Sequence, residues 1–143
     1  MDENVRIILL CGGRLREGFF REAASEYTKR IRRFARIEVR EMEDLKSLER
    51  ILDSDDYLIA LDENGREMTS LEFAELVKKI YLSGKDLYLI IGGWSGIEER
   101  IKRRADLILS LSRMTFPYQL ARIMILEQIY RAFSLLRGID YHK

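Results

Sequence analysis

Two short loops carry the residue types that could hold a ligand. The first, Gly92-Gly93-Trp94-Ser95-Gly96, directly follows the apolar run Leu87–Ile91, and the second, residues 111–117, follows the apolar run at 107–109. Glycine permits positive φ angles and lets a ligand approach the backbone, and the second loop adds serine and threonine hydroxyls. In α/β proteins, ligands bind where loops leave the carboxyl ends of strands. We therefore expect the two loops to lie side by side and to form a ligand pocket.

The rest of the sequence offers few groups for direct chemistry. It holds one cysteine, Cys11, and one histidine, His142, so neither a catalytic triad nor a metal site is expected. The glycine spacing matches neither the dinucleotide-binding fingerprint nor a P-loop. Such a protein can still act by binding an activated cofactor and holding the target beside it. S-adenosylmethionine, a methyl donor, is one cofactor of this type.

The elements that would position these loops alternate along the chain. Apolar runs predict strands, and apolar residues at helical spacing predict the segments between them as helices. This alternation predicts a mostly parallel α/β sheet with helices on both faces, in a single domain spanning residues 1–143. Asp62-Glu63-Asn64-Gly65 predicts a turn at the end of the third strand. The expected strands are 5–11, 36–40, 57–61, 87–91 and 107–111, and the expected helices are 17–33, 45–52, 69–83, 97–104 and 118–137.

The last of these helices is apolar over more than one stripe. Leu120, Ile123, Met124, Leu126, Ile129, Tyr130, Phe133 and Leu136 are its apolar residues. A helix of this kind needs two packing partners, of which the sheet is one. The second is either a large core within one chain or a second copy of the chain across a two-fold interface. We favour the homodimer because the core of so short a chain is small.

The net charge of +1 conceals a strong segregation of charge along the chain. Residues 1–40 carry ten Lys/Arg and six Asp/Glu, residues 41–72 carry three and eleven, and residues 73–143 carry twelve and seven. The middle segment therefore cannot face a polyanion, whereas the two ends can. The alternative is that the charges simply solvate the surface of a thermostable protein. Six basic residues between 29 and 40, against the single acid Glu38, exceed what a helix C-terminus needs. We favour a phosphate-facing patch there.

The sequence also favours a cytoplasmic protein without membrane contact. No apolar run reaches the roughly 20 residues that a membrane-spanning helix requires. A single cysteine forms no internal disulfide and suits a reducing compartment.

Four motifs together resemble one family. They are Leu89-Ile90-Ile91-Gly92-Gly93-x-x-Gly96, Leu109-Ser110-Leu111-Ser112-x-x-Thr115-x-Pro117, Glu127-Gln128-Ile129-Tyr130-Arg131-Ala132 and the terminal Tyr141-His142. In this order and spacing they resemble the bacterial RlmH family, the YbeA-like SPOUT methyltransferases, over nearly the whole chain. The resemblance implies an α/β fold with a C-terminal trefoil knot that forms an S-adenosylmethionine pocket. It also implies a homodimer that methylates N3 of a pseudouridine in 23S rRNA on the assembled ribosome.

The same resemblance assigns candidate site residues. For the cofactor it implies Leu61, the knot glycines Gly92, Gly93 and Gly96, and the loop Leu111, Ser112, Arg113, Met114, Thr115 and Phe116. For the target base it implies Arg131, which would position a phosphate or base. It also implies Tyr141 and His142, which would orient the target or assist loss of its N3 proton.

Several residues keep a second explanation. Arg131 is also an i+4 partner of Glu127, Ser112 and Thr115 could satisfy loop backbone, and Trp94 either stacks on a base or covers the core. Tyr118 and Lys143 stand where the family usually has histidine and arginine. These departures leave two alternatives open: a non-catalytic ribosome-binding module, and a methyltransferase for another structured RNA such as tRNA.

Overall fold

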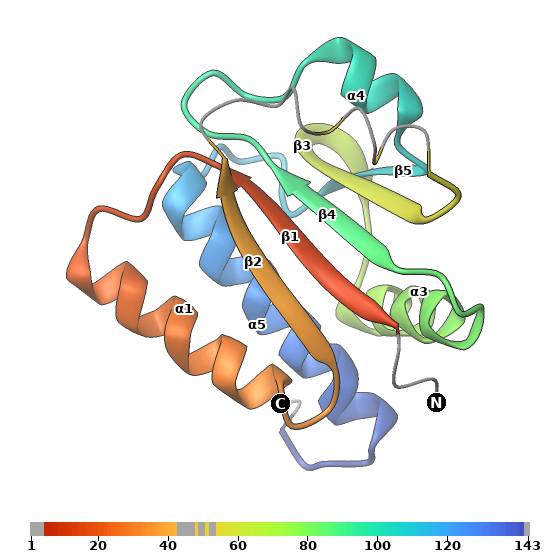
Figure 1. Cartoon of the computed structure of the whole chain (residues 1–143). Coiled ribbons are helices and arrows are strands. Elements are labelled where there is room, and N and C mark those ends of the chain that lie inside the picture. Colours follow the sequence, from red (N-terminus) through yellow and green to blue (C-terminus); the bar gives the residue numbers. More distant parts are fainter. Residues whose placement is uncertain (1–4, 43–47, 49–50, 52–53, 142–143) are drawn as a thin grey trace.

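The computed structural model describes residues 5–42, 48, 51 and 54–141. Its five strands are all parallel and lie in the order β2-β1-β4-β3-β5 (Figure 1). The expected helix at 45–52 falls largely outside the described residues. The strands are β1 (Arg6–Gly12), β2 (Arg36–Met42), β3 (Tyr57–Glu67), β4 (Leu87–Ile91) and β5 (Leu107–Ser110), and the helices are α1 (Gly18–Ile31), α3 (Ser70–Leu82), α4 (Glu99–Arg104) and α5 (Tyr118–Leu136).

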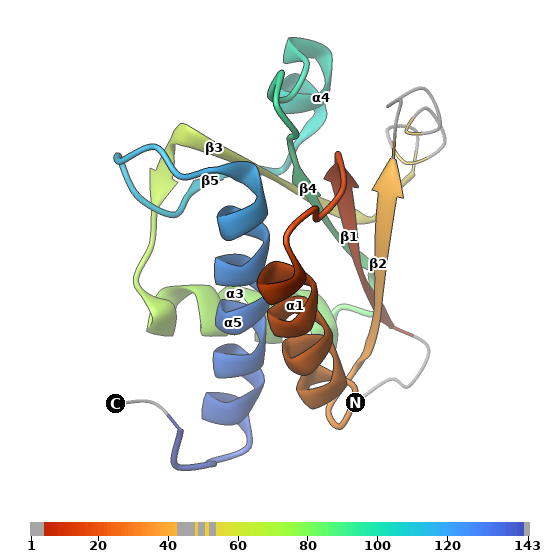
Figure 2. The ribbon, with the colours of Figure 1, turned by 90° about the vertical axis from the view of Figure 1, so that its left-hand side faces the viewer.

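Apolar side chains cover both faces of the sheet, as a parallel sheet requires. Ile7, Leu9 and Cys11 of β1 pack into the core shared with α1, α3 and α5. The alternate residues Ile8 and Leu10 pack into a second, smaller core with Ile101 of α4. Figure 2 shows the three long helices on one side of the sheet. The prediction of a mostly parallel sheet with helices on both faces is therefore confirmed.

The turn predicted at Asp62–Gly65 is wrong, because β3 continues through it to Glu67. The pairing of β3 with β5 shifts register between Leu61 and Arg66, so the turn-like residues form an irregularity inside the strand. Gly65 makes this possible, since a Cβ there would lie 2.6 Å from the carbonyl oxygen of Ile108. Ile108 lies more than 40 residues further along the chain, so a prediction from local turn propensity cannot include this contact.

Local signals did fix the ends of α3. Thr69 accepts a hydrogen bond from the Glu72 N–H at 3.1 Å, and the Glu72 carboxylate accepts one from the Thr69 N–H at 2.9 Å. This reciprocal capping box stabilises the first turn. The helix ends at Ser83 and Gly84, whose φ of +79° suits glycine.

Helix α5 runs between α1 and α3 and packs against both. Ile125, Leu126, Ile129 and Phe133 are fully buried within the one chain. Neighbours in the same chain thus cover much of the apolar circumference that we attributed to a second copy. The homodimer stays a prediction.

Candidate functional site

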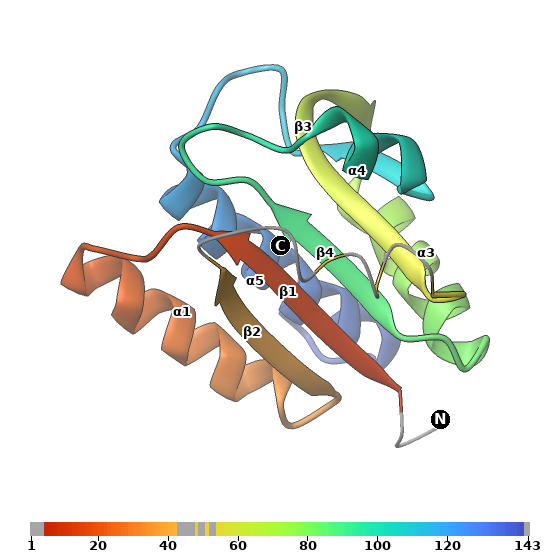
Figure 3. The ribbon, with the colours of Figure 1, turned by 45° about the horizontal axis from the view of Figure 1, so that its top comes forward.

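A cavity of about 850 Å³ opens at the carboxyl ends of the strands. The glycine-rich loop after β4 and the Ser/Thr loop after β5 both line it, although β3 separates the two strands in the sheet. Figure 3 shows the two loops running near each other above the sheet. The predicted pocket is therefore present. Its lining residues are Leu61, Asp62, Glu63, Ile91–Ile97, Leu109, Leu111, Ser112, Thr115–Tyr118 and Ala121.

Two of the three loop glycines are packed against backbone, and the third has a positive φ. A Cβ on Gly92 would lie 2.7 Å from the carbonyl carbon of Gly96, and one on Gly93 would lie 2.7 Å from the carbonyl oxygen of Gly12. Gly96 has a φ of +78° and donates its N–H to the Gly93 carbonyl at 3.1 Å. A side chain at 92 or 93 would force the loops apart, so the shape of this wall depends on glycine.

The Ser/Thr loop is tied to β3 and to itself. The Thr115 hydroxyl donates to Glu63 Oε2 at 2.5 Å, and the Ser112 hydroxyl accepts from the Met114 N–H at 3.0 Å. Ser110 Oγ lies 3.1 Å from the Glu63 carbonyl oxygen. The structural explanation for Ser112 and Thr115 thus has direct support, and both residues also line the cavity.

Two of the predicted cofactor residues point elsewhere. Met114 is 74% exposed, and Arg113 lies in solvent with its Nε 3.4 Å from Glu67 Oε1. Neither side chain lines the cavity, whereas Leu61, Gly92, Gly93, Gly96, Leu111, Ser112, Thr115 and Phe116 all do.

Residues that were not predicted for the site complete its walls. Asp62 and Glu63 bring carboxylates to the cavity, and Lys102 lies 3.5 Å from Asp62 Oδ2. On the other side Tyr118 lines the cavity, and its ring lies 3.1 Å from where a Gly13 Cβ would be. Two sequence signals point to these residues: the acid-rich Asp62–Gly65 segment, which local propensity predicts as a turn, and Tyr118 at a position where the family usually has histidine.

A buried arginine supports the wall around Tyr118. Arg122 is 2% exposed, donates to Glu41 Oε2 at 2.8 Å and donates to the Gly13 carbonyl at 3.0 Å. Partial burial alone would raise the pKa of Glu41, but hydrogen bonds from Arg122 and the Leu15 N–H outweigh it, so this pKa lies below its usual value. The pair joins β2, the loop after β1 and α5.

The predicted residues for the target base form a separate cluster near the end of α5. Arg131 Nε donates to Glu127 Oε1 at 2.8 Å, and the Tyr141 hydroxyl donates to the same oxygen at 3.4 Å. The Arg131 guanidinium lies 5.0 Å from the centre of the Tyr141 ring. The hydrogen bond to Glu127 raises the pKa of Arg131, and burial raises the pKa of Tyr141 to about 12. His142 lies outside the described residues.

Within one chain the structure does not bring this cluster to the cavity. Tyr118 begins α5 at the cavity, and Arg131 lies about 20 Å further along the helix at about 1.5 Å per residue. Figure 2 shows α5 running from the loop after β5 toward the opposite end of the molecule. Glu127 instead lines a second cavity of about 390 Å³ beside α3.

The described residues contain neither a candidate metal cluster nor a candidate membrane-spanning helix. No group of His, Cys, Asp or Glu side chains among them could hold a metal ion. No helix in this part of the chain is long and apolar enough to cross a membrane.

Comparison with known proteins gives one consistent result. A family model described as "Predicted SPOUT methyltransferase" matches residues 5–142. The chain is 39% identical to ribosomal RNA large subunit methyltransferase H of Caldicellulosiruptor saccharolyticus, over 96% of this chain and 99% of that protein. It is 36% identical to the protein of the same name from Clostridium novyi, over 97% of this chain and all of that protein.

Solved structures share the fold at low sequence identity. A "probable methylase family protein" from Haemophilus influenzae Rd KW20 superimposes with a TM-score of 0.62 at 12% identity, covering 99% of this chain and 71% of that one. The SpoU methyltransferase AviRb of Streptomyces viridochromogenes, solved in complex with AdoMet, gives 0.50 at 12% identity, covering 92% and 58%.

Proposed function

The chain belongs to the SPOUT methyltransferase family, and from that premise we propose that it methylates ribosomal RNA with S-adenosylmethionine as methyl donor. The finer proposal is transfer to N3 of a pseudouridine in 23S rRNA on the assembled ribosome, in the cytoplasm. It is supported by relatives of nearly equal length that are named ribosomal RNA large subunit methyltransferase H.

The observation that carries the proposal is the cavity at the carboxyl ends of the strands. Its volume of about 850 Å³ falls in the range of small-molecule sites, and its walls combine apolar residues with exposed loop backbone. Gly92 and Gly93 let the backbone segments of this wall pack more closely than any side chain would allow. The carboxylates of Asp62 and Glu63 can accept hydrogen bonds from ribose hydroxyls and favour a cationic ligand.

These residues fit S-adenosylmethionine, which when bound supplies an electrophilic methyl group. The apolar walls Leu61, Ile91, Leu109 and Leu111 exclude water, and the two loops fix the orientation of whatever they enclose. We extend the proposal to a trefoil knot in the segment from β4 to α5.

We further propose that the active form is a homodimer whose sites combine the two ends of α5. Arg131 and Tyr141 lie about 20 Å from the cavity of their own chain, too far to act on a base held there. A second copy arranged across a two-fold axis can bring its own Arg131 and Tyr141 to that cavity.

The proposed roles at the target follow from charge and protonation. Arg131 remains cationic and would hold a phosphate or a developing negative charge on the base. A pKa of about 12 keeps Tyr141 protonated at neutral pH, so it would orient the base by donating a hydrogen bond. His142 is the remaining candidate to assist loss of the N3 proton.

The test is a methyl-transfer assay with labelled donor and three substrates. Ribosomes from a strain that lacks the modification are compared with free ribosomal RNA and with tRNA, and the modified nucleotide is mapped by mass spectrometry. We expect label in 23S rRNA with assembled ribosomes. Label in tRNA instead would identify tRNA as the substrate. Ribosome binding without methyl transfer would support a non-catalytic binding module.

A further inference from the structure

The loop after β1 meets the glycine-rich loop at the edge of the cavity. A Cβ on Gly12 would lie 2.7 Å from the backbone nitrogen of Gly93, so the two chain segments are in backbone contact. The Tyr118 hydroxyl, at the cavity wall, lies 3.5 Å from the Arg14 carbonyl oxygen. Residues that follow Gly12 and Gly93 therefore emerge side by side at the mouth of the cavity.

Five hydrogen bonds to neighbouring side chains hold the loop after β1 in place. As described above, Arg122 donates to the Gly13 carbonyl, and Glu41 accepts a hydrogen bond from the Leu15 N–H. The Arg21 guanidinium donates to the Arg16 carbonyl at 2.7 Å and to the Leu15 carbonyl at 3.2 Å. The Arg16 N–H donates to Gln119 Oε1 of α5 at 2.8 Å. The loop backbone is thus fixed, while the side chains of Arg14 and Arg16 remain on the surface.

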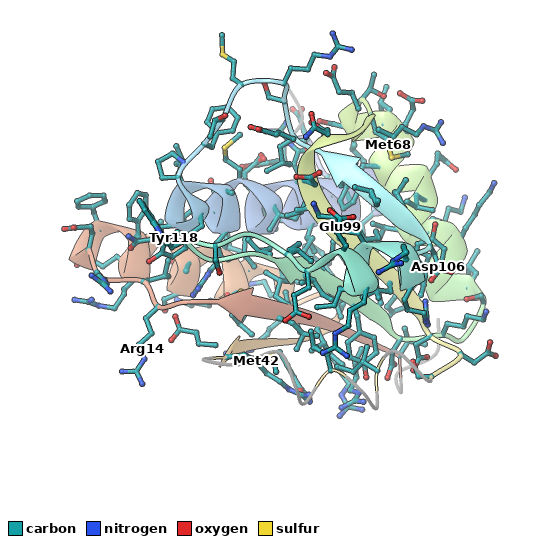
Figure 4. All side chains as sticks on the ribbon, turned by 90° about the horizontal axis from the view of Figure 1, so that it is seen from above. Arg14, Met42, Met68, Glu99, Asp106 and Tyr118 are labelled. Atoms are coloured by element: carbon teal, nitrogen blue, oxygen red, sulfur yellow. The ribbon has the colours of Figure 1, made fainter. Side chains whose placement is uncertain are left out.

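The exposed side chains at this edge are basic and aromatic. Arg14 and Arg16 come from one loop, and Figure 4 shows the Arg14 side chain extending outward into solvent. Trp94 comes from the other loop and is 95% exposed, although its neighbours in that loop pack tightly. Exposing the large apolar indole ring to water is unfavourable, and burial within this chain does not offset that cost. The exposed acids here are Glu17 and Glu41. Glu17 stands at the start of α1, where the helix dipole offsets its charge, and Glu41 is held by Arg122 and interacts electrostatically with Arg14.

We propose that Arg14, Arg16 and Trp94 form an RNA-docking rim on the cofactor cavity. Arg14 and Arg16 bind phosphates of the strand that carries the target nucleotide, and Trp94 stacks on an unpaired base next to it. This combination of backbone cations and one stacking platform is how proteins hold single-stranded RNA. Arg122 is a positioning residue for the rim because it fixes the loop without reaching solvent. The inference rests on the proposed function and adds to it the surface that receives the RNA.

The rim differs from the basic patch expected between residues 29 and 40. That patch begins at the C-terminal end of α1 and lies with the Arg131 cluster, since Arg30 stacks over the Tyr130 ring at 5.6 Å. Its Arg30 and Arg40 are each paired with a glutamate, at 2.9 Å and 2.6 Å. Of the two basic surfaces, only the rim borders the cavity of its own chain.

Three variants separate the parts of this proposal. Arg14→Ala/Arg16→Ala removes the two cations, and Trp94→Ala removes the platform. Lys78→Ala/Lys79→Ala removes the same charge from the exposed side of α3 and serves as control. For each, the Kd for S-adenosylmethionine is measured by calorimetry. The Kd for ribosomes lacking the modification is measured by co-sedimentation over a series of KCl concentrations.

The arginine and tryptophan variants should give different signatures. The double arginine variant should weaken ribosome binding about tenfold or more and reduce the slope of log Kd against log salt by about two, one for each lost phosphate contact. Trp94→Ala should weaken binding about five- to 100-fold with the slope unchanged. The control variant should change neither quantity by more than about twofold. The control and the double arginine variant, whose substituted residues do not line the cavity, should both bind S-adenosylmethionine like the wild type.

Two results would overturn the rim. One is a double arginine variant with the control's affinity and salt slope, and the other is wild-type protein that does not bind ribosomes. Weaker S-adenosylmethionine binding by the double arginine variant, in parallel with weaker ribosome binding, would also count against it, because the two arginines would then be shaping the cavity. If the wild type binds ribosomes with the expected signatures but transfers no methyl group, the rim stands and the proposed function fails.

Discussion

The two ends of α5 are built in opposite ways. At its N-terminal end the cavity is shaped in part by close backbone packing, with Gly92 against Gly96 of its own loop and Gly93 against the loop after β1. At its C-terminal end Arg131, Glu127 and Tyr141 contact one another through side chains. The first region is sensitive to added atoms, and the second is sensitive to lost charge. We assign cofactor binding to the first and the target base to the second, so substitutions at the two ends should impair different steps.

The largest effect should come from Arg131→Ala. It removes a positive charge that we propose lies at the target base, and kcat should fall about 100- to 1000-fold, as for other lost charge-stabilising donors. The Kd for S-adenosylmethionine should stay within about twofold of wild type, because the residue lies at the other end of the helix. Single-turnover methyl transfer and calorimetry give the two quantities, with Lys78→Ala as the matched loss of an exposed cation. A parallel loss of cofactor affinity would contradict the assignment of cofactor binding and target positioning to separate ends of α5.

Gly92→Ala tests the other end. The new Cβ would meet the backbone of Gly96 at 2.7 Å, and relieving that overlap costs about 1–3 kcal/mol. Cofactor affinity should therefore fall about five- to 100-fold. At a saturating cofactor concentration the rate should return to near that of the wild type. Gly18→Ala is the control, since a Cβ there meets nothing closer than 3.9 Å. Unchanged cofactor affinity in a folded Gly92→Ala protein would place the cofactor elsewhere.

The smallest effect is expected for Tyr141→Phe. The lost hydrogen bond to Glu127 is long, 3.4 Å, and its removal should lower kcat about two- to tenfold. Since the folded pKa of about 12 exceeds the usual 10, the neutral phenol is the favoured form. Its contribution to stability is complete below pH 10 and is lost only as pH rises through 12. The kcat profiles of wild type and variant should therefore have the same shape between about pH 6 and pH 9. An inflection that disappears with the hydroxyl would make Tyr141 a base.

The sequence predicted best where local pattern and fold agree. Apolar runs located β4 and β5, and the glycines after β4 indicated the cavity, because both signals lie within a few residues. The continuation of β3 through Gly65 was missed, since it depends on contact with Ile108. The Arg122–Glu41 pair was missed for the same reason, because its partners are 81 residues apart in the chain. A helical pattern shows that position 122 faces inward but not which acid it will meet.

The same limit applies to the catalytic assignment. Motif resemblance placed Arg131 and the cofactor loops in one site, although a single chain holds them at opposite ends of one helix. Sequence motifs record which residues act together, but they do not say whether one copy or two supply them.

Mixing two inactive variants tests the central claim most directly. Gly92→Ala and Arg131→Ala proteins, each shown to be folded by thermal melting, are combined in equal amounts under subunit exchange. Methyl transfer to ribosomes is then measured at a low cofactor concentration. If each site takes its cavity from one chain and Arg131 from the other, half the dimers carry one intact site, and about a quarter of wild-type activity should return. No recovery, despite subunit exchange confirmed by mass spectrometry, would contradict the account.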